Sequence, residues 1–373
     1  MFSHLLLHES VVGVDIGSSS IKIVHVEPTG QGAQTPHVAI CPTPPNSVQE
    51  GVVVNVPEVA AAIQFAMRSA GIKASSAITA ISGPGVIVRR VQIPTMSEQM
   101  LRKSIVLEAG KYISASIEDS VLEFEILGDA EEHGQMNVLL VAGPRVMINS
   151  KVNALEQADL EPLAVDIEAF ATFRALIERN PDQSLRESTA ALLDIGASHT
   201  EINLVCNGEL ELTRTIPIAG RSLANAIKNA ENCTEDEAEQ RKHSLDLSEV
   251  MQLPAGSAPD PGLKVVQSLV DEMLREIRRS INFYQSQLPE GAAETTVDRL
   301  VLTGGTARLK GLLPYASSRL NVEVDIGKPF LGDLPGLQSP EGELGDEDMP
   351  LFTVAFGLAA KEVPAATLLA GVA

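Results

Sequence analysis

The chain has 373 residues, 44% of them hydrophobic and 21% charged, which allows two or three domains around a substantial buried core. Its formal net charge of −21 argues against nucleic acid as a partner and against unaided binding to an anionic membrane, because both surfaces are themselves negative. Three scattered cysteines, and no apolar run of about 20 residues, predict a cytoplasmic protein with free thiols and no transmembrane segment.

The first predicted element is a β-hairpin, VVGVDIGSSSIKIVHV, whose apolar strands flank a Gly/Ser turn with one acid, Asp15, at the bend. A helix is expected over 57–70, because Val59, Ile63 and Met67 recur at helical spacing. A short strand over 77–81 then leads into the turn SGPG.

A compact inserted unit of order strand, helix, strand, strand, helix is predicted next. The strand VIVRRVQIP ends at Pro94, and a helix capped by Ser97 follows. VLEFEIL alternates with period two, MNVLLVAG is an apolar strand, and 146–158 has a helical pattern.

The second half of the chain repeats the first hairpin in ALLDIGASHTEINLV, where Asp194 matches Asp15. A polar helical region over 223–243, a long amphipathic helix over 263–287, and a strand, Gly-rich turn and helix in DRLVLTGGTARLKGL come next. A last helix is expected over 352–361.

Two such hairpins far apart in one chain predict a duplicated α/β fold whose turns face each other. The expected domains are a first-lobe core at 1–85 continued by 161–185, an inserted βαββα subdomain at 86–160, a second-lobe core at 186–225 continued by 296–362, and a helical subdomain of the second lobe at 226–295.

Three Gly-rich turns, DIGSSS, DIGASHT and TGGTARLKG, each follow an apolar strand. Such turns expose successive backbone N–H groups that suit phosphate oxygens, and Ser and Thr hydroxyls add donors. A carboxylate repels phosphate unless a cation lies between them, so Asp15 and Asp194 predict Mg²⁺ held through water. The third turn suits the nucleoside end of a nucleotide, because glycine lets a flat ring or a ribose approach the backbone.

The order of these turns resembles the first phosphate, second phosphate and adenosine motifs of the actin-like ATPase superfamily, and within it the chain resembles the PilM family of type IV pilus assembly proteins. The resemblance covers nearly the whole chain and includes RRVQIPTMSEQML, LEAGKYI, NALEQADLEPLAVDIEA, LREIRRSINFYQSQ and VDRLVLTGGTARLKGLLPY. It implies an actin-like ATPase fold of two lobes, with a duplicated core, a small inserted subdomain in the first lobe, and ATP with Mg²⁺ in the cleft between the lobes.

The chain departs from that family in two places. It has no Trp, and it reads KYISASIED where the family usually has a Trp and a more acidic, Pro-containing end. The acidic tract over 332–348 is also unusual and is expected to be a mobile, solvated loop.

The resemblance also implies a set of site residues. The expected nucleotide-binding residues are Asp15, Gly17, Ser18, Ser19, Ser20 and Lys22 in the first turn, Asp194, Gly196, Ala197, Ser198, His199 and Thr200 in the second, Gly304, Gly305, Thr306 and Arg308 in the third, and Glu239 with Lys242 near the adenine and ribose. The segment VDIEAFATFRAL resembles the superfamily's first connector, which makes Glu168 the candidate water-positioning acid of at most a slow ATPase.

Each of these assignments has a plain structural alternative. Lys22 could be a surface charge at a strand edge, and Glu168 a favourable charge at a helix N-terminus. Glu239 and Lys242 could form a solvated ion pair on one helix face. His199 is expected to act through its backbone N–H and not as a base.

By the same resemblance, the protein docks the N-terminal cytoplasmic tail of a PilN-type inner-membrane protein of a pilus, secretion or competence machine, in a groove between the first lobe and the inserted subdomain. It would be peripheral at the inner membrane and would link that platform to cytoplasmic motor ATPases. A strand edge of the subdomain could pair with an extended tail. Arg89 and Arg90 would orient the tail or contact a motor, or else offset Glu123 and Glu125 across the sheet.

Two rival functions fit the same fold. A small-molecule kinase would need a catalytic Asp facing a substrate pocket, and Asp15 and Asp166 are the only candidates. A filament-forming division protein of the FtsA type would end in a basic amphipathic membrane helix, whereas this chain ends KEVPAATLLAGVA.

Overall fold

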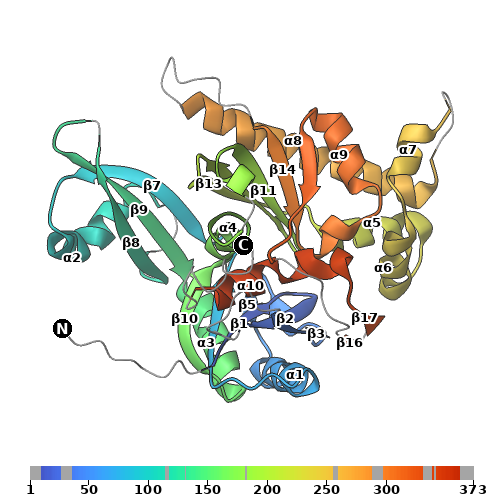
Figure 1. Ribbon diagram of the computed structural model, residues 1–373, viewed down its shortest axis with the longest axis horizontal. Coiled ribbons are helices and arrows are strands. Elements are labelled where there is room, and N and C mark those ends of the chain that lie inside the picture. The colour runs from blue at the N-terminus through green and yellow to red at the C-terminus, as the bar shows by residue number, and fades with distance from the viewer. Residues whose placement is uncertain are drawn as a thin grey trace.

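The computed structural model describes residues 10–26, 36–113, 117–130, 132–180, 183–254, 259–287, 297–330, 338–339 and 342–361. In these residues the chain forms two lobes, each built on a five-stranded mixed sheet, and a three-stranded sheet that projects from the first lobe (Figure 1).

The two large sheets share one topology. The first has the order β10-β6-β1-β2-β3, and the second β13-β12-β11-β14-β15. In each, a central antiparallel hairpin continues to an antiparallel edge strand on one side and to two parallel strands on the other. This correspondence confirms the duplicated core and the actin-like α/β fold predicted from the sequence.

The strands of the first sheet are β1 (Val11–Ile16), β2 (Ser20–His25), β3 (His37–Pro42), β6 (Ser76–Ile81) and β10 (Glu161–Ile167). Those of the second are β11 (Thr189–Ile195), β12 (Thr200–Cys206), β13 (Glu209–Ile216), β14 (Arg299–Thr303) and β15 (Glu323–Ile326). Two short pairs are β4 (Val48–Gln49) with β5 (Val52–Val53), and β16 (Gln338–Ser339) with β17 (Gly342–Glu343).

The helices beside the first sheet are α1 (Val56–Ser69), α3 (Arg145–Gln157), α4 (Glu168–Phe173), the π-helix η1 (Arg174–Glu178) and the 3-10 turn η2 (Gln183–Leu185). The second lobe carries α5 (Gly220–Glu231), α6 (Glu235–Ser244), α7 (Ser248–Gln252), α8 (Pro261–Gln287), the 3-10 helix η3 (Gly305–Arg308) and α9 (Leu312–Leu320). The last described elements are the 3-10 helix η4 (Asp346–Phe352) and α10 (Thr353–Ala359).

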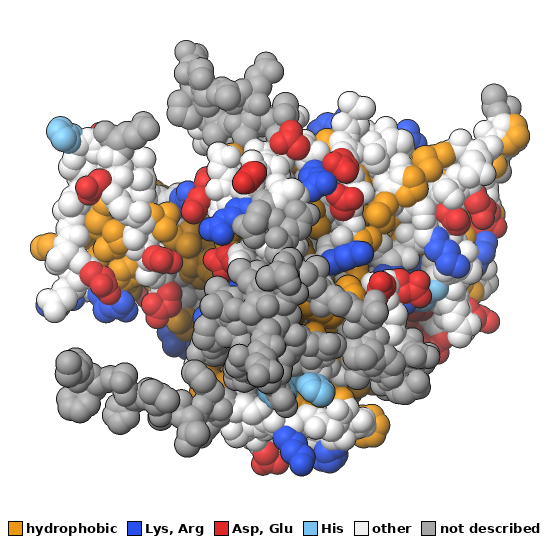
Figure 2. Space-filling model, viewed as in Figure 1, with side chains coloured by type: hydrophobic (Ala, Val, Ile, Leu, Met, Phe, Trp, Pro, Cys, Tyr) orange, Lys and Arg blue, Asp and Glu red, His pale blue; other side chains and the backbone are white. Residues whose placement is uncertain are grey.

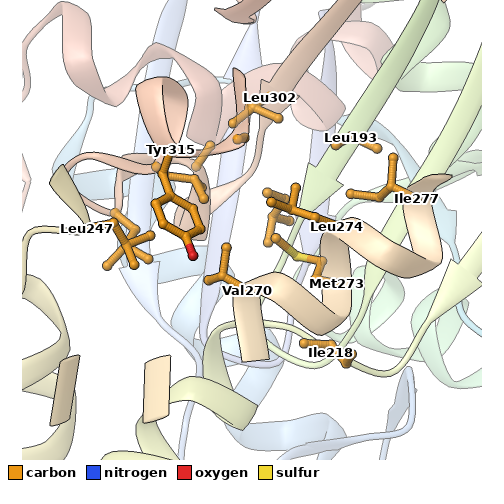
Figure 3. Close-up of a cluster of buried hydrophobic side chains, with 14 of the residues drawn as sticks. Leu193, Ile218, Leu247, Val270, Met273, Leu274, Ile277, Leu302 and Tyr315 are labelled. Carbon is orange, nitrogen blue, oxygen red and sulfur yellow. The ribbon is translucent and has the colours of Figure 1, made fainter. Parts of the chain in front are cut away.

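The helical patterns in the sequence correctly indicate which faces of α1 and α8 are buried. On α1, Val59, Ile63 and Met67 are buried against the first sheet. On α8, Val270 and Ile277 enter the core of the second lobe (Figure 3). The polar helical region over 223–243 is two helices, because the chain turns between α5 and α6 at Asn232, whose φ is +53°.

The inserted subdomain contains β7 (Ile87–Pro94), α2 (Glu98–Ala109), β8 (Ser120–Asp129) and β9 (Gln135–Pro144), with β9 at the centre of its sheet. The side chain of Ser97 accepts a hydrogen bond from the Met100 N–H at the start of α2, as its capping role predicted. The helix α3, which the sequence analysis groups with this subdomain, packs against α1, β5 and β10 of the first lobe.

The C-terminal helix α10 lies between the two sheets. It packs against β1, β2 and α4 of the first lobe, although the sequence analysis places it in the second. Two glycines permit this approach: a Cβ at Gly13 would lie 2.0 Å from the Ala355 carbonyl oxygen, and one at Gly357 would lie 1.9 Å from the Ala171 carbonyl oxygen.

The acidic tract over 332–348 falls partly outside the described residues. Its described end differs from the predicted solvated loop, because Asp348 is buried in η4 and forms an ion pair with Arg308 (3.1 Å between Oδ1 and Nη2). The ion pair holds this end of the tract to the second lobe, and the apolar residues that follow pack against both lobes.

Candidate functional site

The two matching hairpins end in turns of the same geometry. In the first, the Gly17 N–H donates to the Ser20 carbonyl over 3.2 Å, and in the second the Gly196 N–H donates to the His199 carbonyl over 3.1 Å. The strand register places Asp15 opposite Lys22 and Asp194 opposite Glu201. The two turns therefore present an acid at the same position, with a cation across from one and a second acid across from the other.

These turns meet across the two lobes. Ser18 Oγ and Ser198 Oγ lie 2.5 Å apart and share a hydrogen bond. His199 Nε2 lies 3.0 Å from Ser82 Oγ, on the SGPG turn of the first lobe. The prediction that the two turns face each other is confirmed, and Ser82 is a cleft residue that the sequence analysis missed.

A cleft of about 440 Å³ opens between the lobes at this point. It is lined by nearly all the residues predicted for the site: Asp15, Gly17, Ser18, Ser19, Ser20, Lys22, Glu168, Asp194, Gly196, Ala197, Ser198, His199, Glu239, Lys242, Gly304, Gly305, Thr306 and Arg308. Thr200 is the exception, because it is fully buried and its hydroxyl donates to the Ile218 carbonyl over 2.7 Å. A direct nucleotide contact through the Thr200 side chain does not fit this placement.

Lys22 faces into the cleft and is not the surface charge that was its alternative. Its side chain is only 14% exposed, and its Nζ lies 2.9 Å from Asp15 Oδ2. Burial lowers the pKa of Lys22, but the charge and hydrogen bond of Asp15, with the charges of Asp194 and Glu168, raise it overall. Lys22 is therefore a firmly charged group that neutralises Asp15.

In the described part of the chain, no Lys or Arg forms an ion pair with Asp194 as Lys22 does with Asp15. Burial raises the pKa of Asp194 to about 7, the charges of Glu168 and Asp15 add to this effect, and Lys22 offsets part of it. A carboxylate held in this state gains from a cation placed beside it. Of the two predicted acids, Asp194 is thus the one whose charge the protein leaves uncompensated.

Glu201 adds a further acid that the sequence analysis missed. It is 3% exposed, and its Oε2 has no hydrogen-bond partner among the described residues. Burial raises its pKa well above the ordinary range, and the charges of Glu168 and Asp194 reinforce the shift. The signal was present in the sequence, since Glu201 stands seven residues after Asp194, as Lys22 does after Asp15.

Glu168 begins α4 at the edge of the cleft, so its charge also lies at a helix N-terminus. Its Oε1 is 4.0 Å from the Nζ of Lys151, a buried lysine on α3. Lys151 Nζ donates to the carbonyls of Ala80 (2.6 Å) and Ile16 (3.3 Å). No sequence pattern indicated this residue, because a lysine inside a helix usually reaches solvent.

The third turn touches the second. Gly304 has a φ of +83°, and a Cβ there would lie 2.3 Å from Asp194 Oδ1. Thr306 Oγ1 donates to the Gly196 carbonyl over 2.9 Å. This close contact requires glycine at position 304. At Gly305 the nearest neighbour of a Cβ would lie 3.5 Å away, so the protein itself leaves room for a side chain there.

Two further residues of the cleft lining form a pair, in which Lys242 Nζ lies 2.5 Å from Glu239 Oε1. Burial opposes ionisation of Glu239, but hydrogen bonds from His243 and Lys242 outweigh it and lower its pKa to about 2. Lys242 is buried and also donates to the Gly220 carbonyl over 3.5 Å. The pair lines the cleft and is not merely a solvated pair on a helix face.

No group of three or more His, Cys, Asp or Glu side chains in the described residues is placed to hold a metal directly. The donor set nevertheless fits Mg²⁺, which keeps several waters and is held by one or two carboxylates with substrate phosphates. Asp194 is the acid best suited to that role, with Asp15 beside it.

The duplicated sheets, the helices between them and a cleft lined by three Gly-rich turns define an actin-like ATPase fold. A family model described as type IV pilus assembly protein PilM matches residues 13–363. The solved structure of a PilM–PilN type IV pilus biogenesis complex contains a chain with a TM-score of 0.77 and 26% identity, over 95% of this chain and 99% of that one. The chain belongs to the PilM family.

More distant relatives agree with the fold. The cell division protein FtsA of Pseudomonas aeruginosa is 26% identical over 86% of this chain and 83% of its own length. The structure of the ethanolamine utilization protein EutJ from Carboxydothermus hydrogenoformans has a TM-score of 0.55 at 19% identity, over 93% of this chain and 88% of that one. In the described part of the chain, no helix is both long and apolar enough to cross a bilayer.

Proposed function

We propose that the protein binds ATP with Mg²⁺ in the cleft between its lobes and, in doing so, controls the docking of a PilN-type inner-membrane protein during type IV pilus assembly. The observation that carries the nucleotide proposal is the convergence of three Gly-rich turns, distant in sequence, on one cleft with an uncompensated acid. The first two turns would hold the phosphates through backbone N–H groups, and Asp194, with Asp15 beside it, would hold Mg²⁺ through water.

The remaining residues take roles from their positions. Glu239 and Lys242 line the cleft near Gly220, where the adenine and ribose would lie beside Gly305. Glu168 would orient a water molecule for slow hydrolysis. Lys151, whose Nζ lies 4.0 Å from Glu168 Oε1, would limit the positions open to the Glu168 side chain.

An isothermal titration with ATP in the presence of Mg²⁺ or EDTA tests the nucleotide proposal directly. Saturable binding that requires Mg²⁺ in the wild type is the expected result. Absence of binding with Mg²⁺ present would refute it.

The partner proposal rests on family membership and on the surface beside the inserted subdomain. The solved structure that matches this chain is that of a PilM–PilN complex. In the present chain, half-buried apolar side chains from the subdomain (Val88 and Val141) and from the first lobe (Val165 and Phe170) pack at one junction. Figure 2 shows hydrophobic side chains gathered over the subdomain and along its boundary with the lobes.

The first-lobe strand at this junction is β10, which ends the described part of its sheet. Leu163 on β10 is 47% exposed. An edge strand with exposed apolar side chains can accept an extended peptide through main-chain hydrogen bonds. The tail of a PilN-type protein would bind here and hold this protein at the inner membrane, from which it would reach the cytoplasmic motor ATPases.

The arginines of β7 do not offset Glu123 and Glu125, which was one of the two roles expected for them. Neither pairs with Glu123 or Glu125, because β8 bonds to β9 and not to β7. Arg90 instead forms ion pairs with Glu209 (3.3 Å) and Glu211 (3.0 Å) of the second lobe. These ion pairs connect the subdomain to the second lobe. A change in the angle between the lobes would therefore move the subdomain and alter the docking junction.

A synthetic PilN-type tail peptide tests the docking proposal. Leu163→Glu should weaken peptide binding by roughly tenfold or more, because it places a charge at the apolar contact. Phe65→Glu is the matched control, since Phe65 is a 54% exposed apolar residue on α1. Equal affinity of both variants and the wild type for the peptide would refute this location.

Neither rival function gains support. Asp166, the kinase candidate, is buried and paired with Arg174 and Lys361, each 3.1 Å from its Oδ2, and it does not line the cleft. The FtsA relatives are 21–26% identical, whereas the family model that matches nearly the whole chain is that of PilM.

A further inference from the structure

Arg221 lies against both phosphate turns at the point where the lobes meet. It is the second residue of α5, and its own N–H donates to the Ala197 carbonyl over 2.8 Å, which fixes it beside the second turn. Its Nη2 donates to the Ser18 carbonyl over 3.3 Å, and its Nη1 lies 3.5 Å from Ser198 Oγ. One guanidinium therefore contacts a turn from each lobe.

Arg221 lies beside the cleft, and the lysines and arginines that line the cleft all have carboxylate partners. The pairs are Lys22 with Asp15, Lys151 with Glu168, Lys242 with Glu239 and Arg308 with Asp348. Among the described residues, no carboxylate forms an ion pair with Arg221, although the chain has a net charge of −21. Its guanidinium is instead occupied by a carbonyl and a hydroxyl, which are neutral acceptors.

We propose that Arg221 binds the terminal phosphate of the nucleotide and thereby distinguishes a triphosphate from a diphosphate. This rests on the proposed ATP-binding function. The phosphates are proposed to lie on the first two turns, which meet at the Ser18–Ser198 contact. Arg221 contacts both serines there, so a phosphate held between the turns would lie beside its guanidinium. A phosphate oxygen is a stronger acceptor for a guanidinium than a neutral oxygen, and its planar fork can hold two such oxygens.

The position of Arg221 gives the recognition a consequence for the lobes. The Ser18 and Ser198 hydroxyls must part to admit a phosphate oxygen, since they now bond to each other. Arg221 would then restore the link between the turns through that phosphate. Closure of the lobes would depend on the terminal phosphate, because a bound diphosphate would not connect the two turns.

The test compares ATP and ADP, both with Mg²⁺, by isothermal titration on the full chain. Arg221→Ala should weaken ATP binding about tenfold or more and ADP binding by less than about twofold, because only ATP reaches the guanidinium. Arg221→Lys should fall between the wild type and Arg221→Ala, since it keeps the charge and loses the fork. Arg221 is exposed, so unfolding temperatures without nucleotide should match the wild type.

Lys228→Ala is the matched control. It removes one positive charge from the same helix, about 10 Å further along, and should leave both affinities unchanged. Equal weakening of ATP and ADP in Arg221→Ala, or no change in either, would overturn the proposed role of Arg221 alone. Failure of the wild type to bind any nucleotide would overturn the proposed function and this inference with it.

Discussion

Replacement of Asp194 by Asn should stabilise the metal-free protein while it removes the protein's response to Mg²⁺ and ATP. Asn keeps the shape of the carboxyl group but cannot ionise. In the wild type, burial and the charges of Glu168 and Asp15 raise the pKa of Asp194 to about 7. The folded chain therefore resists ionisation of this group at neutral pH.

The magnitude follows from the pKa difference. In the unfolded chain Asp194 titrates near its ordinary value of 3.8. Between that pH and about 7 the folded state binds more protons than the unfolded state, so the free energy of unfolding falls as pH rises. The full difference corresponds to about 4 kcal/mol, and we expect about 2 kcal/mol because water reaches the side chain at the cleft.

The assay is thermal unfolding in EDTA, without nucleotide, from pH 4 to pH 8. The unfolding temperature of Asp194→Asn should equal that of the wild type near pH 4, exceed it increasingly as pH rises, and level off above about pH 7 with a gain of about 3 °C. Glu272→Gln on α8 is the control, since it removes an exposed acid from the same lobe. A variant less stable than the wild type at pH 8 would refute the electrostatic reasoning.

The remaining predictions concern the response of Asp194→Asn to Mg²⁺ and ATP and three substitutions of glycine. With Mg²⁺ and ATP at about a hundred times the dissociation constant, the wild type should gain about 2.7 kcal/mol of stability, and Asp194→Asn should gain much less in the same thermal shift assay. Gly304→Ala should lower the unfolding temperature, because its Cβ would lie 2.3 Å from Asp194 Oδ1 and its φ is positive. Gly305→Val should leave that temperature unchanged yet abolish ATP binding in a titration, and unchanged binding would show that the nucleoside lies elsewhere. Gly357→Ala should cost about 1–3 kcal/mol or more in urea unfolding, since its Cβ would lie 1.9 Å from the Ala171 carbonyl oxygen.

The paired turns could be predicted because their signals are local. An apolar strand, an acid and a Gly/Ser turn identify each hairpin, and their repetition identifies the duplicated fold. From duplication it follows that the two turns face each other, and the Ser18–Ser198 contact confirms this. The same comparison of repeats would have found Glu201, which stands opposite Asp194 as Lys22 stands opposite Asp15.

The positions of other site residues depend on tertiary packing, which local sequence patterns do not indicate. Lys151 has the sequence context of a solvated helix residue, but α3 packs on the first lobe and directs its ammonium to two carbonyls. Arg90 is separated from Glu123 by the strand order of the small sheet, and it pairs with the second lobe because β7 contacts β13 there. Helix α10 follows the second lobe in sequence and packs between the sheets, where Gly13 and Gly357 leave room for it.

The same packing explains how a nucleotide in the cleft could act on a partner at the inserted subdomain without a long path between them. The chain enters the subdomain through the SGPG turn, where Ser82 bonds to His199 of the second turn. It leaves through Pro144 into α3, where Lys151 bonds to the Ile16 carbonyl immediately before the first turn. Entry and exit also touch each other, since a Cβ on Gly85 would lie 2.9 Å from Pro144 Cγ. One connection thus contacts the second turn and the other adjoins the first. Under the proposed function, a phosphate that separates the two turns would shift the base of the subdomain on both sides.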